Sequence, residues 1–349
     1  MGERQSDGLK LIGLFVLSLA VSTTLIIGRA RCATLSSPMA KSSPVASPAA
    51  SPSPAAAATP AAQEASKTPQ YVSGELCKAC HYKETQEFTK TMMGHLFMLH
   101  PRDDLEQLGC QGCHGPGSLH VKSGGKDVGG MITFNPKLDP SVKADNAKCL
   151  ACHSGGQQAF WRAGTHAFRG LACGDCHTVM RDVSPRFNLA SARQVNPFIM
   201  IRPQTQVCLR CHMRKRMQME LPSRMPLWEG LMVCTDCHNP HGGPYPHMLC
   251  DATVNEVCYR CHAEKRGPFL WTHPPVMMNC DDCHTPHGSI NRFMLKIREP
   301  RLCQQCHIGT FHPGTPAGIG SVLVFNRACT NCHSQVHGSN SPGGQALTR

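Results

Sequence analysis

The chain has 349 residues, of which 22 are Cys and 20 are His, and its formal net charge is +12 at pH 7. Aromatic residues make up only 5% of the chain and charged residues only 17%. A conventional enzyme domain of this length builds its interior from aromatic and branched side chains, so this composition argues against one. It leaves the question of what the cysteines hold.

The N-terminal segment, residues 1–32, predicts export. Leu11–Gly28 is an uncharged apolar run of 18 residues, suited to a signal-peptide core and just long enough to span a bilayer. Cleavage near Gly28, retention as a membrane anchor and lipidation of Cys32 are three open alternatives. Each of them places the rest of the chain outside the cytoplasm.

The next segment, residues 33–70, is a predicted linker. It contains 12 Ala, 8 Ser and 7 Pro and no aromatic residue. Such a composition cannot bury a hydrophobic core. We therefore expect the functional domain to occupy residues 71–349.

The string Cys-x-x-Cys-His occurs ten times in that domain. It is the attachment signal of c-type haem, in which both thiols bind the porphyrin and the adjacent His becomes the proximal iron ligand. A zinc ribbon does not need the His, and a disulfide framework has no reason to place it there. We therefore expect ten covalently bound haems. The attachment residues are Cys77, Cys80, Cys110, Cys113, Cys149, Cys152, Cys173, Cys176, Cys208, Cys211, Cys234, Cys237, Cys258, Cys261, Cys280, Cys283, Cys303, Cys306, Cys329 and Cys332. The proximal ligands are His81, His114, His153, His177, His212, His238, His262, His284, His307 and His333.

The positive charge of the chain does not indicate a nucleic-acid partner. Each haem carries two propionates, about −2, and a ferric porphyrin core adds about +1, so ten oxidised haems contribute about −10. We expect the basic residues to offset these propionates. Cys250, which lies outside the motifs, is expected to be a buried free thiol.

The motifs alternate in kind, and a second His accompanies most of them. Four of the five even-numbered motifs are followed by a further His, as in Cys237-His238-Asn239-Pro240-His241-Gly242, and several are also preceded by one. This spacing predicts five dihaem units, each with an odd motif, an even motif and two distal ligands. The predicted distal histidines are His95, His120, His166, His241, His273, His287, His312 and His337.

Two positions of this repeat hold Met in place of His. Met180 follows motif 4, and Met225 lies nine residues before Cys234 of motif 6. A Met thioether is an axial haem ligand that raises the reduction potential relative to His. One hypothesis is eight bis-His haems and two His/Met haems. The other is ten bis-His haems, with ligands such as His100 and His247 filling the gaps.

The expected fold class is a multihaem cytochrome c. Residues 71–349 leave about 28 residues for each haem, too few for a strand-built domain around each one. We expect a mostly irregular chain with short α-helices and little or no sheet. The haems should form an elongated array built from the five dihaem units.

The chain resembles the decahaem cytochromes of the MtrA/DmsE/PioA/MtoA family, which belong to porin–cytochrome electron conduits. Besides the motifs, four runs carry the resemblance: Cys113-His114-Gly115-Pro116-Gly117-Ser118-x-His120, Cys237-His238-Asn239-Pro240-His241-Gly242, Ala263-Glu264-Lys265-Arg266-Gly267-Pro268-Phe269 and His337-Gly338-Ser339-Asn340. The family typically has His-His-Pro before motif 6, where this chain has Arg224-Met225-Pro226, and His where Met180 stands.

The resemblance implies a periplasmic electron carrier, not an enzyme, that crosses the outer membrane inside a partner β-barrel porin. Its other partners would be a periplasmic or inner-membrane redox protein and an extracellular cytochrome, mineral or Fe(II). The reaction served would be Fe(II) oxidation or the reduction of metals or dimethyl sulfoxide. The alternatives are a soluble periplasmic electron shuttle and a multihaem reductase of nitrite or a related oxyanion, which would need an open iron coordination site.

Overall fold

The computed structural model describes residues 68–135, 137, 141–181, 203–307 and 328–348. The predicted leader, residues 1–32, and nearly all of the predicted linker lie outside the described residues, as does the predicted ligand His312. The last residue of the predicted linker, Gln70, already contacts the body. Its N–H donates to Oγ of Ser118 at 2.8 Å, and its carbonyl accepts the N–H of Ser118 at 3.1 Å.

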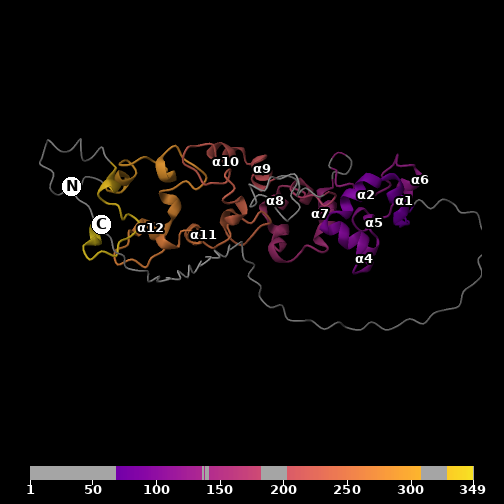
Figure 1. Cartoon of the computed structure of the whole chain (residues 1–349), viewed down its shortest axis with the longest axis horizontal. Helices are drawn as coiled ribbons and strands as arrows, with labels where there is room; N and C mark the ends of the chain where they lie inside the picture. Colours follow the sequence, from indigo (N-terminus) through magenta and orange to yellow (C-terminus); the bar gives the residue numbers. More distant parts are fainter. Residues whose placement is uncertain (1–67, 136, 138–140, 182–202, 308–327, 349) are drawn as a thin grey trace, which may run out of the picture. The chain divides into compact units, whose positions relative to one another are not determined.

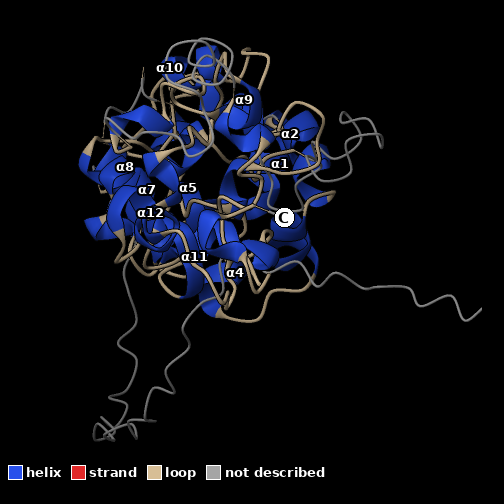
Figure 2. Ribbon diagram, turned by 90° about the vertical axis from the view of Figure 1, so that its left-hand side faces the viewer, coloured by secondary structure: helices blue, strands red, loops and turns tan. Residues whose placement is uncertain are grey.

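The described chain consists of short helices joined by irregular segments, and Figure 2 draws no strand in it. The longest α-helix there has nine residues. The α-helices, labelled in Figure 1, are α1 Gly74–Cys80, α2 Tyr82–Thr89, α3 Met92–Gly94, α4 Asp104–Gln107, α5 Cys110–His114, α6 Ser118–Lys122, α7 Val142–Leu150, α8 Thr165–Phe168, α9 Gln204–Leu209, α10 Met213–Gln218, α11 Val254–Tyr259 and α12 Pro274–Met278. The π-helix is η1 His95–Leu99. The 3₁₀ turns are η2 Gly156–Gln158, η3 Trp161–Ala163, η4 Cys173–Asp175, η7 Cys234–Asp236, η8 Pro246–Met248, η9 Ala263–Lys265, η10 Cys280–Asp282, η11 Arg292–Met294, η12 Cys303–Gln305, η13 Cys329–Asn331 and η14 Gly344–Ala346.

The first cysteine of each motif lies in one of these helices or turns. In nine motifs the N–H of the His donates to the carbonyl of the first Cys, at 2.8–3.1 Å. This helical turn places the first thiol, the second thiol and the imidazole, at positions i, i+3 and i+4, on one face. Helices α1, α7 and α11 are capped by the residues that precede them, Ser73, Ser141 and Thr253, whose hydroxyls accept N–H groups of the first turn.

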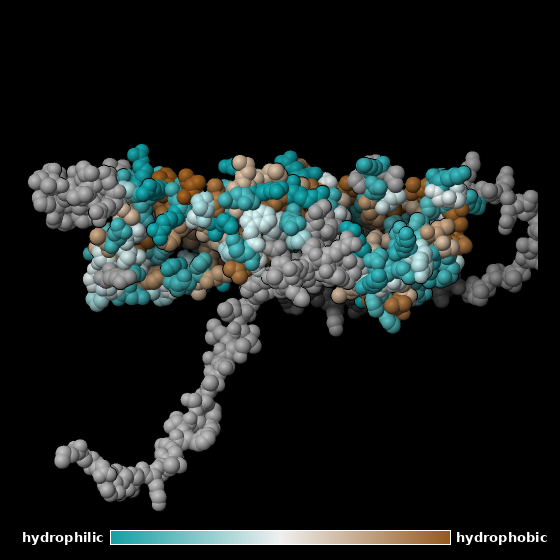
Figure 3. All heavy atoms as spheres, turned by 45° about the horizontal axis from the view of Figure 1, so that its top comes forward, coloured by the Kyte–Doolittle hydropathy of each residue, from teal (hydrophilic) through white to brown (hydrophobic). Residues whose placement is uncertain are grey.

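The interior holds few apolar side chains. The buried hydrophobic residues are Phe88, Phe97, Trp161, Val207, Leu209, Met219, Leu227 and Val257. Other large apolar residues are exposed, such as Phe168 at 84% and Ile290 at 75%. On the face shown in Figure 3 they form small groups among hydrophilic residues. Short helices, irregular connections and this thin core confirm the expected fold class.

None of the described helices is both long enough and apolar enough to cross a bilayer.

Candidate haem sites

The first cysteines of the two motifs in a dihaem unit lie beside each other. The thiols of Cys149 and Cys173 share a hydrogen bond, which raises the pKa of Cys149 and lowers that of Cys173. The next three units repeat this contact, and in the first unit the neighbouring Cys77 adds to burial in raising the pKa of Cys110. The hydrogen-bonded thiol pairs are Cys149–Cys173, Cys208–Cys234, Cys258–Cys280 and Cys303–Cys329.

Successive units also meet in chain order. The pKa of Cys176, the second thiol of motif 4, is raised to about 11, first by burial and then by Cys208 of motif 5. The same relation recurs at the other junctions. It joins Cys113 to Cys149, Cys176 to Cys208, Cys237 to Cys258 and Cys283 to Cys303. The attachment points therefore follow one another from motif 1 to motif 10.

Two buried asparagines hold paired motifs together, and sequence reasoning missed both. Oδ1 of Asn255 accepts the N–H of Cys280 at 2.7 Å, and its Nδ2 donates to the carbonyl of Val276 at 2.9 Å. Asn146 makes the same two contacts, with the N–H of Cys173 at 2.8 Å and the carbonyl of Leu171 at 3.0 Å. The signal in the sequence is an Asn three residues before the first Cys of motifs 3 and 7.

Six pairs of histidine rings face each other across a gap of nearly constant width. Their ring centroids are 6.0–6.2 Å apart, and in five pairs the ring planes lie within 24° of parallel. Each pair joins a proximal histidine to a predicted distal one. The pairs are His81–His120, His212–His166, His177–His241, His238–His287, His307–His273 and His284–His337.

This gap fits a haem iron. Two imidazoles that bind one metal through nitrogens roughly 2 Å away have centroids about 6 Å apart. Hydrogen bonds also orient several of these rings for binding a metal. Nδ1 of His114, His238 and His284 donates to a backbone carbonyl at 2.6–3.0 Å, which leaves Nε2 free for the metal. We conclude that the described residues fit c-type haem.

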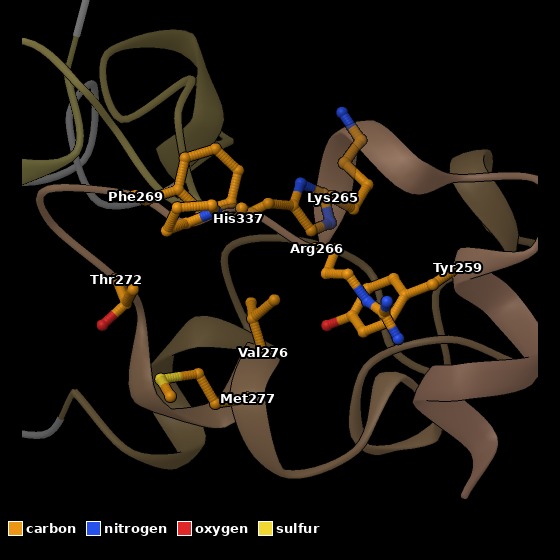
Figure 4. A pocket seen from close by; sticks show the side chains of 10 residues that line it. Tyr259, Lys265, Arg266, Phe269, Thr272, Val276, Met277 and His337 are labelled. Carbon is orange, nitrogen blue, oxygen red and sulfur yellow. The ribbon is translucent and has the colours of Figure 1, made fainter.

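A cavity beside one ring pair has the lining that a porphyrin needs. It has a volume of about 370 Å³ and is bounded by His337, Val276 and Met277, with Lys265 and Arg266 also lining it. Figure 4 shows these side chains around the cavity, with the guanidinium of Arg266 beside Tyr259. Apolar walls accept the macrocycle, and the two cations can pair with its propionates.

Burial keeps several of these imidazoles in the neutral form that binds metal. Loss of solvation is the first cause that lowers the pKa of His241, His287 and His337 to about 4. Neighbouring Lys or His side chains act in the same direction. At neutral pH these rings are therefore unprotonated, as a ligand nitrogen must be.

Five of the six ring pairs connect different dihaem units, which the motif spacing did not reveal; the sixth, His81–His120, lies within the first unit. His241, His287 and His337 each follow an even motif, and each faces the proximal His of the preceding even motif. His166 and His273 precede an even motif, and each faces the proximal His of the next odd motif. The distal ligands thus tie each unit to its neighbours.

Of the remaining proximal histidines, His114, His153 and His262 face no other histidine ring among the described residues. His114 instead has the ring of Phe134 against it, with centroids 5.3 Å apart. His95 begins η1 and His100 follows it, and both are exposed. Met180 is 39% exposed, and Met225 is half-buried.

His247 contributes to the haem site through its backbone carbonyl. Its carbonyl accepts Nδ1 of the proximal His238 at 3.0 Å, and its side chain is exposed. In the next unit the carbonyl of Phe293 does the same for His284, at 2.8 Å. The two residues also share a positive φ, 55° and 58°. An imidazole at position 247 is therefore not required by this loop.

The expectation of a free thiol at Cys250 is wrong. Cys250 is disulfide-bonded, and the other described cysteines are free. The motif count gave no sign of this bond, because it identifies Cys250 only as a cysteine left over.

Comparison with known proteins agrees with this geometry. The model of the doubled CXXCH motif matches residues 225–267 and 273–310, and that of the NrfB-like cytochrome c-type proteins matches residues 110–198. The chain is 39% identical to multiheme cytochrome MtrA of Shewanella baltica (strain OS185) over 282 residues, 78% of this chain and 80% of the relative. It is 27% identical to cytochrome c-type protein NrfB of Escherichia coli O6:H1 over 155 residues, 43% of this chain and 72% of the relative. The resemblance seen in the motifs is confirmed, and the chain belongs to the MtrA family of multihaem c-type cytochromes, which are electron carriers.

Proposed function

We propose that this cytochrome binds ten haems and conducts electrons along them across the outer membrane, inside a partner β-barrel porin. The observation that carries the proposal is the order of the attachment thiols, which neighbour one another both within each dihaem unit and from one unit to the next. Each haem, when bound, supplies a one-electron iron couple. Neighbouring couples in one file are what stepwise electron transfer needs.

The chain's own residues set the properties of this file. The ten motifs would hold the porphyrins, and the ring pairs described above would supply two imidazoles to each of six irons. With both imidazoles bound, these six irons would have no open position for a substrate, which supports a carrier over an oxyanion reductase. The proposed distal ligands are His95, His120, His166, His241, His273, His287, His312, His337, Met180 and Met225.

The tethering of the rings supports fast electron transfer. Nδ1 of the distal His166 donates to the carbonyl of Pro240 at 2.7 Å, and Nδ1 of His120 donates to that of Asp127 at 2.8 Å. These bonds fix the tautomer and the orientation of each ring. A ligand held in this way stays in place when the iron changes its charge.

The proposal also covers the location of the protein and its partners. Residues 1–32 would direct export to the periplasm, residues 33–70 would act as a flexible tether, and residues 71–349 would form the decahaem domain. The proposed donor or acceptor on the inner side is a periplasmic or inner-membrane redox protein. On the outer side it is an extracellular cytochrome, a mineral or Fe(II).

Purification of the native protein tests the location. Outer membranes are extracted with a mild detergent, and the cytochrome is isolated through a C-terminal tag. We expect a membrane β-barrel protein to co-purify in fixed proportion, and mass spectrometry to find ten haems on the chain. Recovery of the cytochrome alone from the soluble periplasmic fraction would overturn the conduit and support a soluble shuttle.

A further inference from the structure

The segments that carry the distal ligands cross the chain at equivalent places. Two residues before His273, Trp271 pairs with Ser339 through backbone hydrogen bonds of 2.9 and 2.8 Å. Ser339 itself lies two residues after the distal ligand His337. One unit earlier, Ser223 pairs in the same way with Ser289, at 3.1 and 2.7 Å, and Ser289 lies two residues after His287.

These crossings place Met225 at the position of a distal histidine. Met225 follows Ser223 by two residues, just as His273 follows Trp271. The third crossing agrees: at Gly164, two residues before His166, an added Cβ would lie 3.2 Å from the Cα of Gly242, next to His241. Met225 therefore stands where His166 and His273 stand in their own units.

The same comparison shows which proximal histidine the ligand should face. His166 lies between motifs 3 and 4 and faces His212 of motif 5, whereas His273 lies between motifs 7 and 8 and faces His307 of motif 9. Each ligand thus serves the odd motif that follows the next even one. For Met225, between motifs 5 and 6, that motif is motif 7, whose His262 has no paired histidine ring among the described residues.

Two buried donors next to Met225 also point to a bound anion. Nε of Arg224 and Nε1 of Trp228 are both buried, and neither has a hydrogen-bond partner in the described chain. A buried N–H without a partner is costly, so a ligand oxygen is the expected acceptor. Haem propionates would satisfy both donors.

The rival ligand, His247, is held in another role. Its carbonyl accepts Nδ1 of His238 and its side chain is exposed, as is that of Phe293 at the equivalent position. We propose, resting on the decahaem function above, that the thioether of Met225 is the axial ligand opposite His262 on the haem of motif 7. This haem then has a higher reduction potential than the bis-His haems on either side of it.

The proposal is tested on purified holoprotein with Met225→Leu and Met225→His variants. Met219→Leu is the matched control, because Met219 is a buried methionine, at 3% exposure, that lies outside the ligand position. The readout is near-infrared magnetic circular dichroism, which detects thioether ligation of ferric haem. We expect both Met225 variants to lose the intensity of one thioether-ligated haem, and Met219→Leu to lose none.

A redox titration and a haem deletion complete the test. Met225→His should lower the midpoint potential of one haem in ten. Removal of the motif 7 haem by changing Cys258 and Cys261 to Ala should abolish the same band intensity as Met225→Leu. Unchanged intensity in Met225→Leu, or its survival after the haem deletion, would overturn the assignment. Haem count and porin co-purification are independent of residue 225, so failure of the proposed function would be recognised separately.

Discussion

Replacing Asn255 with Ala should loosen the contact between motifs 7 and 8. The change removes two side-chain hydrogen bonds, from the N–H of Cys280 at 2.7 Å and to the carbonyl of Val276 at 2.9 Å. Each bond contributes about 1 kcal/mol net, and a buried group left without a partner costs a further 1–3 kcal/mol or so. Because water can enter the space left by the amide, we expect a local loss of about 2–3 kcal/mol.

Amide hydrogen exchange measured by mass spectrometry checks this value. Since roughly 1.4 kcal/mol corresponds to a factor of ten, the amides around Cys280 should exchange about 30 to 150 times faster. Asn146→Ala should have the same effect around Cys173, because it loses the equivalent bonds. Asn135→Ala is the control: Asn135 is exposed and accepts only the local N–H of Lys137 at 3.0 Å. Less than a threefold change at both Cys280 and Cys173 would refute the idea that these asparagines clamp the dihaem units.

Two further predictions separate the residues that form the haem sites from their neighbours. His287→Ala should convert one haem in ten to a high-spin ferric signal in electron paramagnetic resonance, because the ring that faces His238 at 6.1 Å is lost. His247→Phe should leave the spectrum unchanged. The opposite result would reverse the roles of the two histidines. Gly288→Ala should destabilise the protein by roughly 2 kcal/mol or more, since residue 288 has a φ of +144° and an added Cβ would overlap the carbonyl of Gln218. Gly243→Ala, whose Cβ would come no closer than 3.9 Å to another residue, should change the thermal midpoint little; equal losses in the two variants would show that the tight chain crossing is not the cause.

The sequence was sufficient for the chemistry that is local in the chain. A thiol, a second thiol three residues later and the adjacent His form one helical turn, so each motif could be read without a structure. The Gly after His241, His287 and His337 was visible as a pattern, but its reason was not. Gly242, Gly288 and Gly338 lie where another segment crosses so closely that a Cβ would collide with it.

The partners of the distal ligands could not be predicted from spacing. His287 lies three residues after the proximal His284 of its own motif, yet it faces His238 of the preceding even motif. This choice depends on where the chain crosses itself, as at Ser223 and Ser289, and contacts of that kind leave no periodic trace. The same holds for Asn255, which looks like any polar helix residue until its partners near Cys280 are known.

Electron transfer across a sealed membrane tests directly whether the haems of this chain conduct electrons from one side to the other. The detergent-extracted complex is reconstituted into liposomes that enclose an iron(III) chelate, and a membrane-impermeant reductant is added outside. A continuous haem file predicts rapid reduction of the enclosed iron and reoxidation of the haems. It also predicts that this reduction slows at least tenfold when a central haem is removed by changing Cys208 and Cys211 to Ala. Failure of the intact complex to reduce the enclosed iron, or an equal rate after the central haem is removed, would contradict conduction along the chain.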